Sequence, residues 1–70
     1  MILENNKVDK LIKDTLRKEK KLSTYEIAKK IGVSWSTVNS HCYKLKSFGI
    51  VDCKNEETKV GMRRIVWWLK

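Results

Sequence analysis

Apolar side chains recur at helical spacing in the first two thirds of the chain, and this pattern predicts three helices. The first is expected to begin near residue 7, because Val8, Ile12 and Leu16 repeat on one face with lysines and arginines around the rest. Residues 1–6 show no clear period. We therefore expect them to form a flexible lead-in to a domain that spans residues 7–70.

The start of the second helix is predicted from a capping box, in which the hydroxyl of Ser23 and the carboxylate of Glu26 satisfy backbone amides. Gly32 tolerates a positive φ and is expected to end this helix. The residues that form its predicted apolar face are Tyr25, Ile27, Ala28 and Ile31.

The third helix is expected to begin after Ser34, which is placed to cap it, and to stop at Gly49. Its predicted apolar positions are Trp35, Val38, Cys42, Leu45 and Phe48.

Beyond Gly49 the period changes to two, which predicts a β-hairpin with arms at Ile50–Lys54 and Gly61–Leu69 around the polar stretch Asn55–Lys59. Leu22 and Ser23 can add a short strand at its edge. The predicted fold is mainly α with a small two- or three-stranded antiparallel sheet. In the second arm, the residues assigned to the core are Ile65, Trp67 and Leu69, and those assigned to the opposite face are Arg64, Val66, Trp68 and Lys70.

The charge of the chain points to a polyanionic partner. Sixteen Lys and Arg against eight Asp and Glu give 70 residues a formal charge of +8, and residues 27–51 contain no acidic side chain. No apolar run is long enough to cross a bilayer, and the amino terminus lacks the pattern of a signal peptide. We therefore expect a cytoplasmic protein without a membrane partner.

The second and third predicted helices meet the requirements of a helix-turn-helix. Ala28 is small enough for the helices to cross closely, Gly32 allows the turn, Val33 is the apolar turn residue, and Val38 and Leu45 pin the second helix against the first.

On these residues the chain resembles the winged helix-turn-helix family, in particular small prokaryotic regulators of the MarR and ArsR kind. Residues 34–42, Ser-Trp-Ser-Thr-Val-Asn-Ser-His-Cys, are similar to the recognition helix of that family, and residues 44–51 resemble its passage into the wing. The resemblance covers residues 7–70. It implies a double-stranded DNA-binding protein, a transcriptional regulator that represses by occupying a promoter.

The resemblance also implies where DNA is contacted, with the third helix in the major groove and the hairpin along the backbone or minor groove. Asn39 is the best direct reader, since an amide can pair with both groups of an adenine edge. The expected base contacts are Trp35, Ser36, Asn39, Ser40 and Tyr43. The expected backbone and wing contacts are Ser34, Thr37, Lys44, Lys46, Lys54, Lys59, Arg63 and Arg64.

A narrower resemblance concerns winged helices that bind left-handed Z-DNA. Asn39, Tyr43 and Trp67 fall where those domains place an asparagine, a tyrosine and a hairpin tryptophan. The chain departs from their pattern because it has no proline in the wing and has Ser40, not a basic residue, beside the asparagine.

Two other classes of function are weaker on the sequence. A protein-interaction module of a nucleic-acid assembly would use Trp35, Val66 and Trp68 as a docking surface. An enzyme is not expected, because the chain has one histidine and no paired carboxylates in a cleft-forming pattern. No small-molecule substrate is evident, and a homodimer is left open.

Metal binding is also weak on the sequence. His41, Cys42 and Cys53 match no zinc spacing, so neither a metal nor another cofactor is expected. In a reducing cytosol the two cysteines are expected to behave as small apolar residues.

Overall fold

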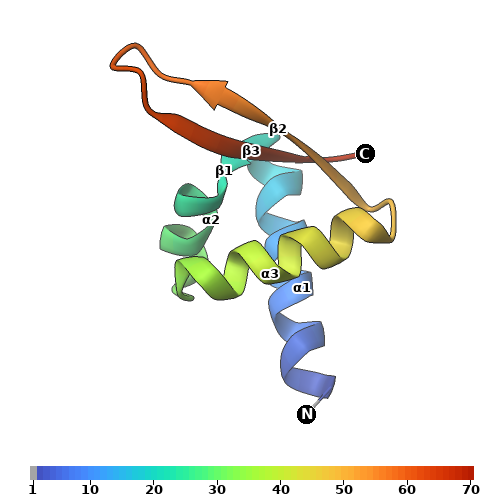
Figure 1. Ribbon diagram of the computed structural model, residues 1–70. Coiled ribbons are helices and arrows are strands. Elements are labelled where there is room, and N and C mark those ends of the chain that lie inside the picture. Colours follow the sequence, from blue (N-terminus) through green and yellow to red (C-terminus); the bar gives the residue numbers. More distant parts are fainter. Residues whose placement is uncertain (1) are drawn as a thin grey trace.

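The computed structural model describes residues 2–70, with side chains from residue 7 onward. Three helices pack beneath a three-stranded antiparallel sheet, whose long hairpin extends beyond the helices (Figure 1). The elements are α1 (Ile2–Glu19), β1 (Lys21–Ser23), α2 (Thr24–Ile31), α3 (Trp35–Ser47), β2 (Val51–Glu57) and β3 (Arg63–Leu69). This is the predicted fold class. None of the helices described is long and apolar enough to span a membrane.

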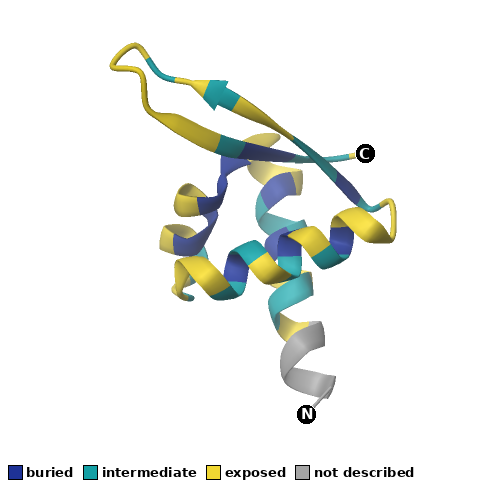
Figure 2. Ribbon diagram, viewed as in Figure 1, coloured by how far each residue is buried: buried dark blue, intermediate teal, exposed yellow. Residues whose placement is uncertain are grey.

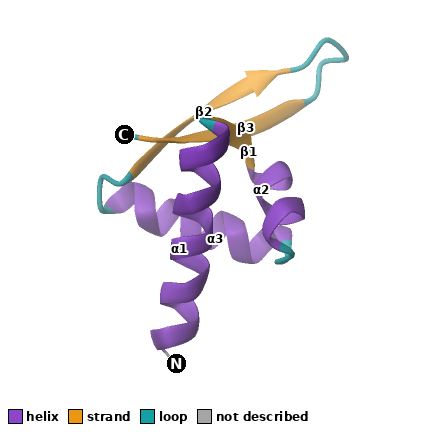
Figure 3. Cartoon of the chain, turned by 180° about the vertical axis from the view of Figure 1, so that it is seen from behind, coloured by secondary structure: helices purple, strands orange, loops and turns teal. Residues whose placement is uncertain are grey.

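Helix α1 begins at Ile2, earlier than residue 7 where the apolar period starts. Met1 lies outside the described residues, and the flexibility expected of residues 1–6 stays a prediction. Ile12 and Leu16 of α1 are buried against the rest of the core. Seen from behind, α1 runs across α3 and reaches the sheet at its carboxyl end (Figure 3).

The predicted caps of the second and third helices are present. The Ser23 side chain accepts a hydrogen bond from the Glu26 amide at 3.1 Å, and the Ser23 amide donates to Glu26 Oε1 at 2.9 Å. Gly32 closes α2 with φ 73°, and Ser34 caps α3 by accepting from the Thr37 amide. These local bonds fix the turn that sets α3 against α2.

The hairpin strands are longer than the alternation predicts. Residues 55–57, expected in a polar connection, continue β2 and pair with residues 63–65 of β3. The turn is instead closed by hydrogen bonds between Thr58 and Met62, with Gly61 at φ 82°. A strand in a projecting hairpin is exposed to water on both faces, so it can be polar throughout. It then lacks the alternation of apolar and polar residues from which strands are predicted.

One aromatic ring anchors the core. Trp67 belongs to β3, and its side chain is fully buried between the sheet and the helices, in a cluster with residues from all three helices. Buried positions line the inner faces of the helices and the base of the hairpin, while the projecting part is exposed (Figure 2). The buried hydrophobic cluster comprises Ile12, Leu16, Leu22, Ile27, Ala28, Val38, Cys42, Leu45, Val51 and Trp67.

Two residues assigned to apolar helix faces, Tyr25 and Phe48, are exposed, and so is Trp35, which is also expected to face outward. Tyr25 is 65% exposed, because at about 100° per residue it points roughly 200° away from Ile27. Phe48 is 70% exposed, since α3 ends at Ser47 and the chain turns away there. Trp35, at the opposite end of α3, is 54% exposed.

The outer face of β3 is less open than predicted. Val66, expected on the exposed side, is buried, because β3 is the central strand and Val66 lies between Ser23 of β1 and Lys54 of β2. A docking surface that needs Val66 is therefore not available.

Candidate nucleic-acid interface

Three polar or aromatic side chains form a stripe along the outer side of α3. Trp35, Asn39 and Tyr43 are spaced four residues apart, so a helix places them one above another on the same face. Trp35 and Tyr43 are exposed and Asn39 is half-buried. We call these three residues the α3 stripe. They are three of the five predicted base contacts, and the other two, Ser36 and Ser40, are also exposed.

The carboxyl end of the stripe is braced by the sheet. The ring of Tyr43 meets that of Trp67 edge-on, with centroids 5.1 Å apart and planes at 86°. Trp67 is itself held, because its Nε1 donates a 2.8 Å hydrogen bond to Oγ1 of Thr24. Such edge-to-face pairs stabilise by about 0.5–1.5 kcal/mol beyond the area that they bury. Tyr43 therefore packs against the scaffold on one side, and with 46% of its surface exposed it can also contact a ligand.

Asn39 presents only one end of its amide. Its Oδ1 atom is buried without a hydrogen-bond partner among the described residues. A bidentate pair with adenine needs both amide atoms at the surface, so this side chain would have to rotate to make one. In the observed rotamer the other end can donate a hydrogen bond outward, to a phosphate or to a bound water.

Two of the predicted backbone contacts are engaged in the cap of α3. The hydroxyl of Ser34 donates to Oγ1 of Thr37 at 2.9 Å and accepts from the Thr37 amide at 3.3 Å. Both residues lie at the start of the helix, beside Trp35. Their first role is to hold that end in place.

The ammonium group of Lys44 forms an ion pair within the protein. Its Nζ lies 2.8 Å from Oδ2 of Asp9 in α1, and Nδ1 of His41 lies 2.8 Å from Oδ1 of the same carboxylate. Burial alone raises the pKa of Asp9, but the hydrogen bonds from Lys44 and His41 outweigh it and hold that pKa below its usual value. The predicted phosphate contact at Lys44 thus has a competing partner that the sequence pattern does not reveal.

The remaining predicted cations lie on the surface. Arg64 is within 3.6 Å of Glu56 across the hairpin. The others make no ion pair within residues 7–70 and are exposed: Lys46, Lys54, Lys59 and Arg63. Charges that no carboxylate neutralises attract phosphate most strongly.

The cysteines are kept as thiols by their surroundings. Burial raises the pKa of the Cys42 thiol to about 12, and burial also raises the pKa of Cys53, which is half-buried. Over the described part of the chain, no three His, Cys, Asp or Glu side chains come together as metal ligands.

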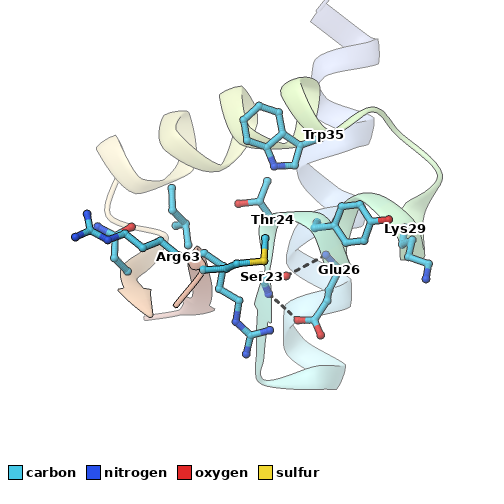
Figure 4. Close-up of a pocket in the computed structure, with 11 residues that line it drawn as sticks. Ser23, Thr24, Glu26, Lys29, Trp35 and Arg63 are labelled. Atoms are coloured by element: carbon cyan, nitrogen blue, oxygen red, sulfur yellow. Dashed lines mark hydrogen bonds between the residues drawn. The ribbon is translucent and has the colours of Figure 1, made fainter. Parts of the chain in front are cut away.

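A groove of about 660 Å³ opens beside the amino-terminal end of the stripe. Trp35 stands over Thr24, with Arg63 of the hairpin on one side and Lys29 of α2 on another (Figure 4). Tyr25 and Met62 also line it, and neither was predicted as a site residue. Tyr25 reads as a core position by helical spacing, and Met62 is 37 residues away in the chain, so no local pattern joins them.

The comparisons with known proteins agree on one family. A model described as winged helix-turn-helix DNA-binding matches residues 5–52. The Zα domain of PKZ from Carassius auratus, in a crystal structure with Z-DNA, is 34% identical, with 96% of this chain and 98% of that chain covered and a TM-score of 0.77. A PKZ Zα domain in complex with ds(CG)6 is 33% identical, covering 91% and 95%, with a TM-score of 0.79.

A more distant structure shares the fold. A possible transcriptional regulator from Methanosarcina mazei Go1 is 17% identical, with 89% of this chain and 53% of that chain covered and a TM-score of 0.77. The search of curated proteins returned no match.

Proposed function

Because the chain belongs to the winged helix-turn-helix DNA-binding family, we propose that it binds double-stranded DNA in the left-handed Z form and recognises it with Asn39 and Tyr43, with buried Trp67 supporting the ring of Tyr43. The observation that carries this proposal is the edge-on pair of Tyr43 and Trp67 beside Asn39. Zα domains of about one-third identity, crystallised with Z-DNA and with ds(CG)6, align with nearly the whole chain.

The stripe suits recognition of duplex shape better than recognition of sequence. Direct readout depends on side chains that pair with both atoms of a base edge, and Asn39 keeps its Oδ1 buried, which disfavours that role in this rotamer. A rigid aromatic face next to a single hydrogen-bond donor instead matches one arrangement of bases and phosphates. Trp67, locked by Thr24, supplies the rigidity.

The hairpin supplies the electrostatic part of the proposed interface. Lys54, Lys59 and Arg63 project from it without carboxylate partners in residues 7–70, and Lys46 adds a charge at the end of α3. Phosphate contacts of this kind strengthen binding to any sequence and weaken as salt is added.

Binding without catalysis is part of the proposal. The one histidine of the chain is largely buried and its Nδ1 is hydrogen-bonded to Asp9, which Lys44 also engages. This cluster joins α1 to α3, so the imidazole of His41 is engaged in a structural contact.

The proposal is tested by circular dichroism of a (CG)6 duplex titrated with the protein. We expect the spectrum to invert with the wild type and with Phe48→Ala, which removes an exposed aromatic that directly follows α3 and is not on the stripe. Tyr43→Ala should prevent the inversion. If the duplex stays right-handed at saturation, and a mixed sequence binds equally well, the proposal is wrong.

A second candidate is a transcriptional regulator, a repressor that reads right-handed DNA with α3 and touches the backbone with the hairpin. The exposed hydroxyls of Ser36 and Ser40 beside Asn39 favour it, since short polar side chains can contact base edges. As a homodimer such a regulator would bind a two-fold site, and as a monomer a single site. Selection of bound duplexes from a random pool separates the candidates: a repressor enriches one defined site, a Z-form binder enriches alternating CG.

A further inference from the structure

Two exposed aromatic rings and three basic side chains line the groove beside the α3 stripe. We infer that it takes one unpaired nucleotide that extends from the duplex, with the base against Trp35 and Tyr25 and the phosphate near Arg63. This inference rests on the proposed placement of the duplex along the stripe.

Two exposed aromatic rings support a base as the occupant. Tyr25 and Trp35 are 65% and 54% exposed, and both line the same groove although they come from different helices. Aromatic side chains at the surface of a nucleic-acid-binding domain serve as platforms on which unpaired bases stack. The groove volume of about 660 Å³ falls within the roughly 300–1,000 Å³ of small-molecule sites.

The charge of the groove favours a nucleotide over an apolar ligand or a peptide. Arg63, Arg64 and Lys29 line it, and the one carboxylate in the lining is that of Glu26. Glu26 accepts the hydrogen bond of the Ser23 amide, which lowers its pKa and ties its charge to the helix cap. The guanidinium of Arg63 can bind a phosphate, because no carboxylate within residues 7–70 forms an ion pair with it.

The groove is continuous with the proposed duplex surface. Trp35 is at once the wall of the groove and the first residue of the stripe, four residues before Asn39. A strand whose paired part lies over Asn39 and Tyr43 would therefore pass the groove as it leaves the duplex. A peptide partner offers no such continuity.

The experiment compares a blunt (CG)6 duplex with the same duplex carrying one unpaired 2-aminopurine nucleotide at its 5′ or 3′ end, and with an abasic extension. We expect one of the two extended duplexes to bind about fivefold or more tightly than the blunt one, the gain expected of one base stack, with quenching of the 2-aminopurine fluorescence. The abasic extension should lack most of this gain.

Variants of the groove complete the test. Trp35→Ala and Tyr25→Ala should each remove the gain and the quenching, whereas Trp35→Phe should keep part of both, and Phe48→Ala should keep all. The inference is overturned if the wild type binds blunt and extended duplexes equally, or if Trp35→Ala weakens both to the same extent, as it would if the duplex backbone itself filled the groove. Failure to bind or invert the blunt duplex would instead mark failure of the proposed function on which the inference rests.

Discussion

Asp9 and His41 join α1 to α3 through a 2.8 Å contact between Oδ1 and Nδ1, and the second carboxylate oxygen of Asp9 holds Lys44 at the same distance. Asp9 is only 14% exposed, so these contacts are shielded from water more than an ordinary surface pair. The carboxylate therefore fixes the inner side of the helix whose outer side carries the α3 stripe.

Asp9→Asn is expected to lower the free energy of unfolding by roughly 1.5–3 kcal/mol at neutral pH, because hydrogen bonds to a charged group are lost. The folded pKa of Asp9 lies below its ordinary value of 3.8, so the stabilisation by Asp9 is fully present above about pH 3.8 and disappears as the pH falls through the folded pKa. Urea unfolding of both proteins between pH 7 and pH 2.5 measures this.

The matched control is Asp14→Asn, which removes a carboxylate of α1 that is 49% exposed and, within residues 7–70, pairs only with exposed Lys10 and Arg17. It should cost less than about 1 kcal/mol. Equal losses in the two variants, or a loss at Asp9 that does not shrink as the pH falls below 3.8, would contradict the role given to Asp9.

Thr24→Val is expected to destabilise the fold by about 1–3 kcal/mol, because the buried indole N–H of Trp67 would lose its acceptor. Thr24→Ser keeps the hydroxyl and should retain most of the stability. Denaturant midpoints measure both, and a Thr24→Val protein as stable as the wild type would show that the bond adds nothing.

Cys42 is expected to resist thiol reagents in the folded protein at pH 8, because it is fully buried and its pKa is about 12. Single-cysteine variants separate it from Cys53, which should react faster. The pKa of Cys42 is about 9 in the unfolded chain and about 12 in the folded protein, so above pH 9 the unfolded chain loses a proton that the folded protein keeps. The free energy of unfolding should therefore fall as the pH rises above about 9. Labelling of Cys42 at the rate of the unfolded chain would contradict its burial.

Arg63→Ala should weaken DNA binding for all sequences and reduce the slope of log affinity against log salt by about 1, the effect of one lost phosphate contact. Lys44→Ala should chiefly lower stability, since its ammonium is paired with Asp9. Fluorescence anisotropy at several salt concentrations distinguishes them. A larger change of slope at Lys44 than at Arg63 would reverse the assignment of the two cations.

Local patterns were enough to predict the helix-turn-helix. The capping box of Ser23 and Glu26, the positive φ of Gly32 and the cap at Ser34 each involve residues at most three apart, so their hydrogen bonds can be inferred from spacing alone. The burial of Val38, Cys42 and Leu45 follows equally from the period of a helix. The acid-free stretch around them correctly indicated a DNA-binding domain.

The arrangement of the proposed DNA-binding surface was decided by contacts between residues far apart in the chain. Asp9 engages Lys44 from another helix, and Trp67 meets Tyr43 and Thr24 from the last strand. The central position of β3 buries Val66, and the groove joins Tyr25, Trp35 and Met62 from three segments. Sequence spacing determines which side of a helix or strand a residue occupies, but only packing determines which other element covers that side.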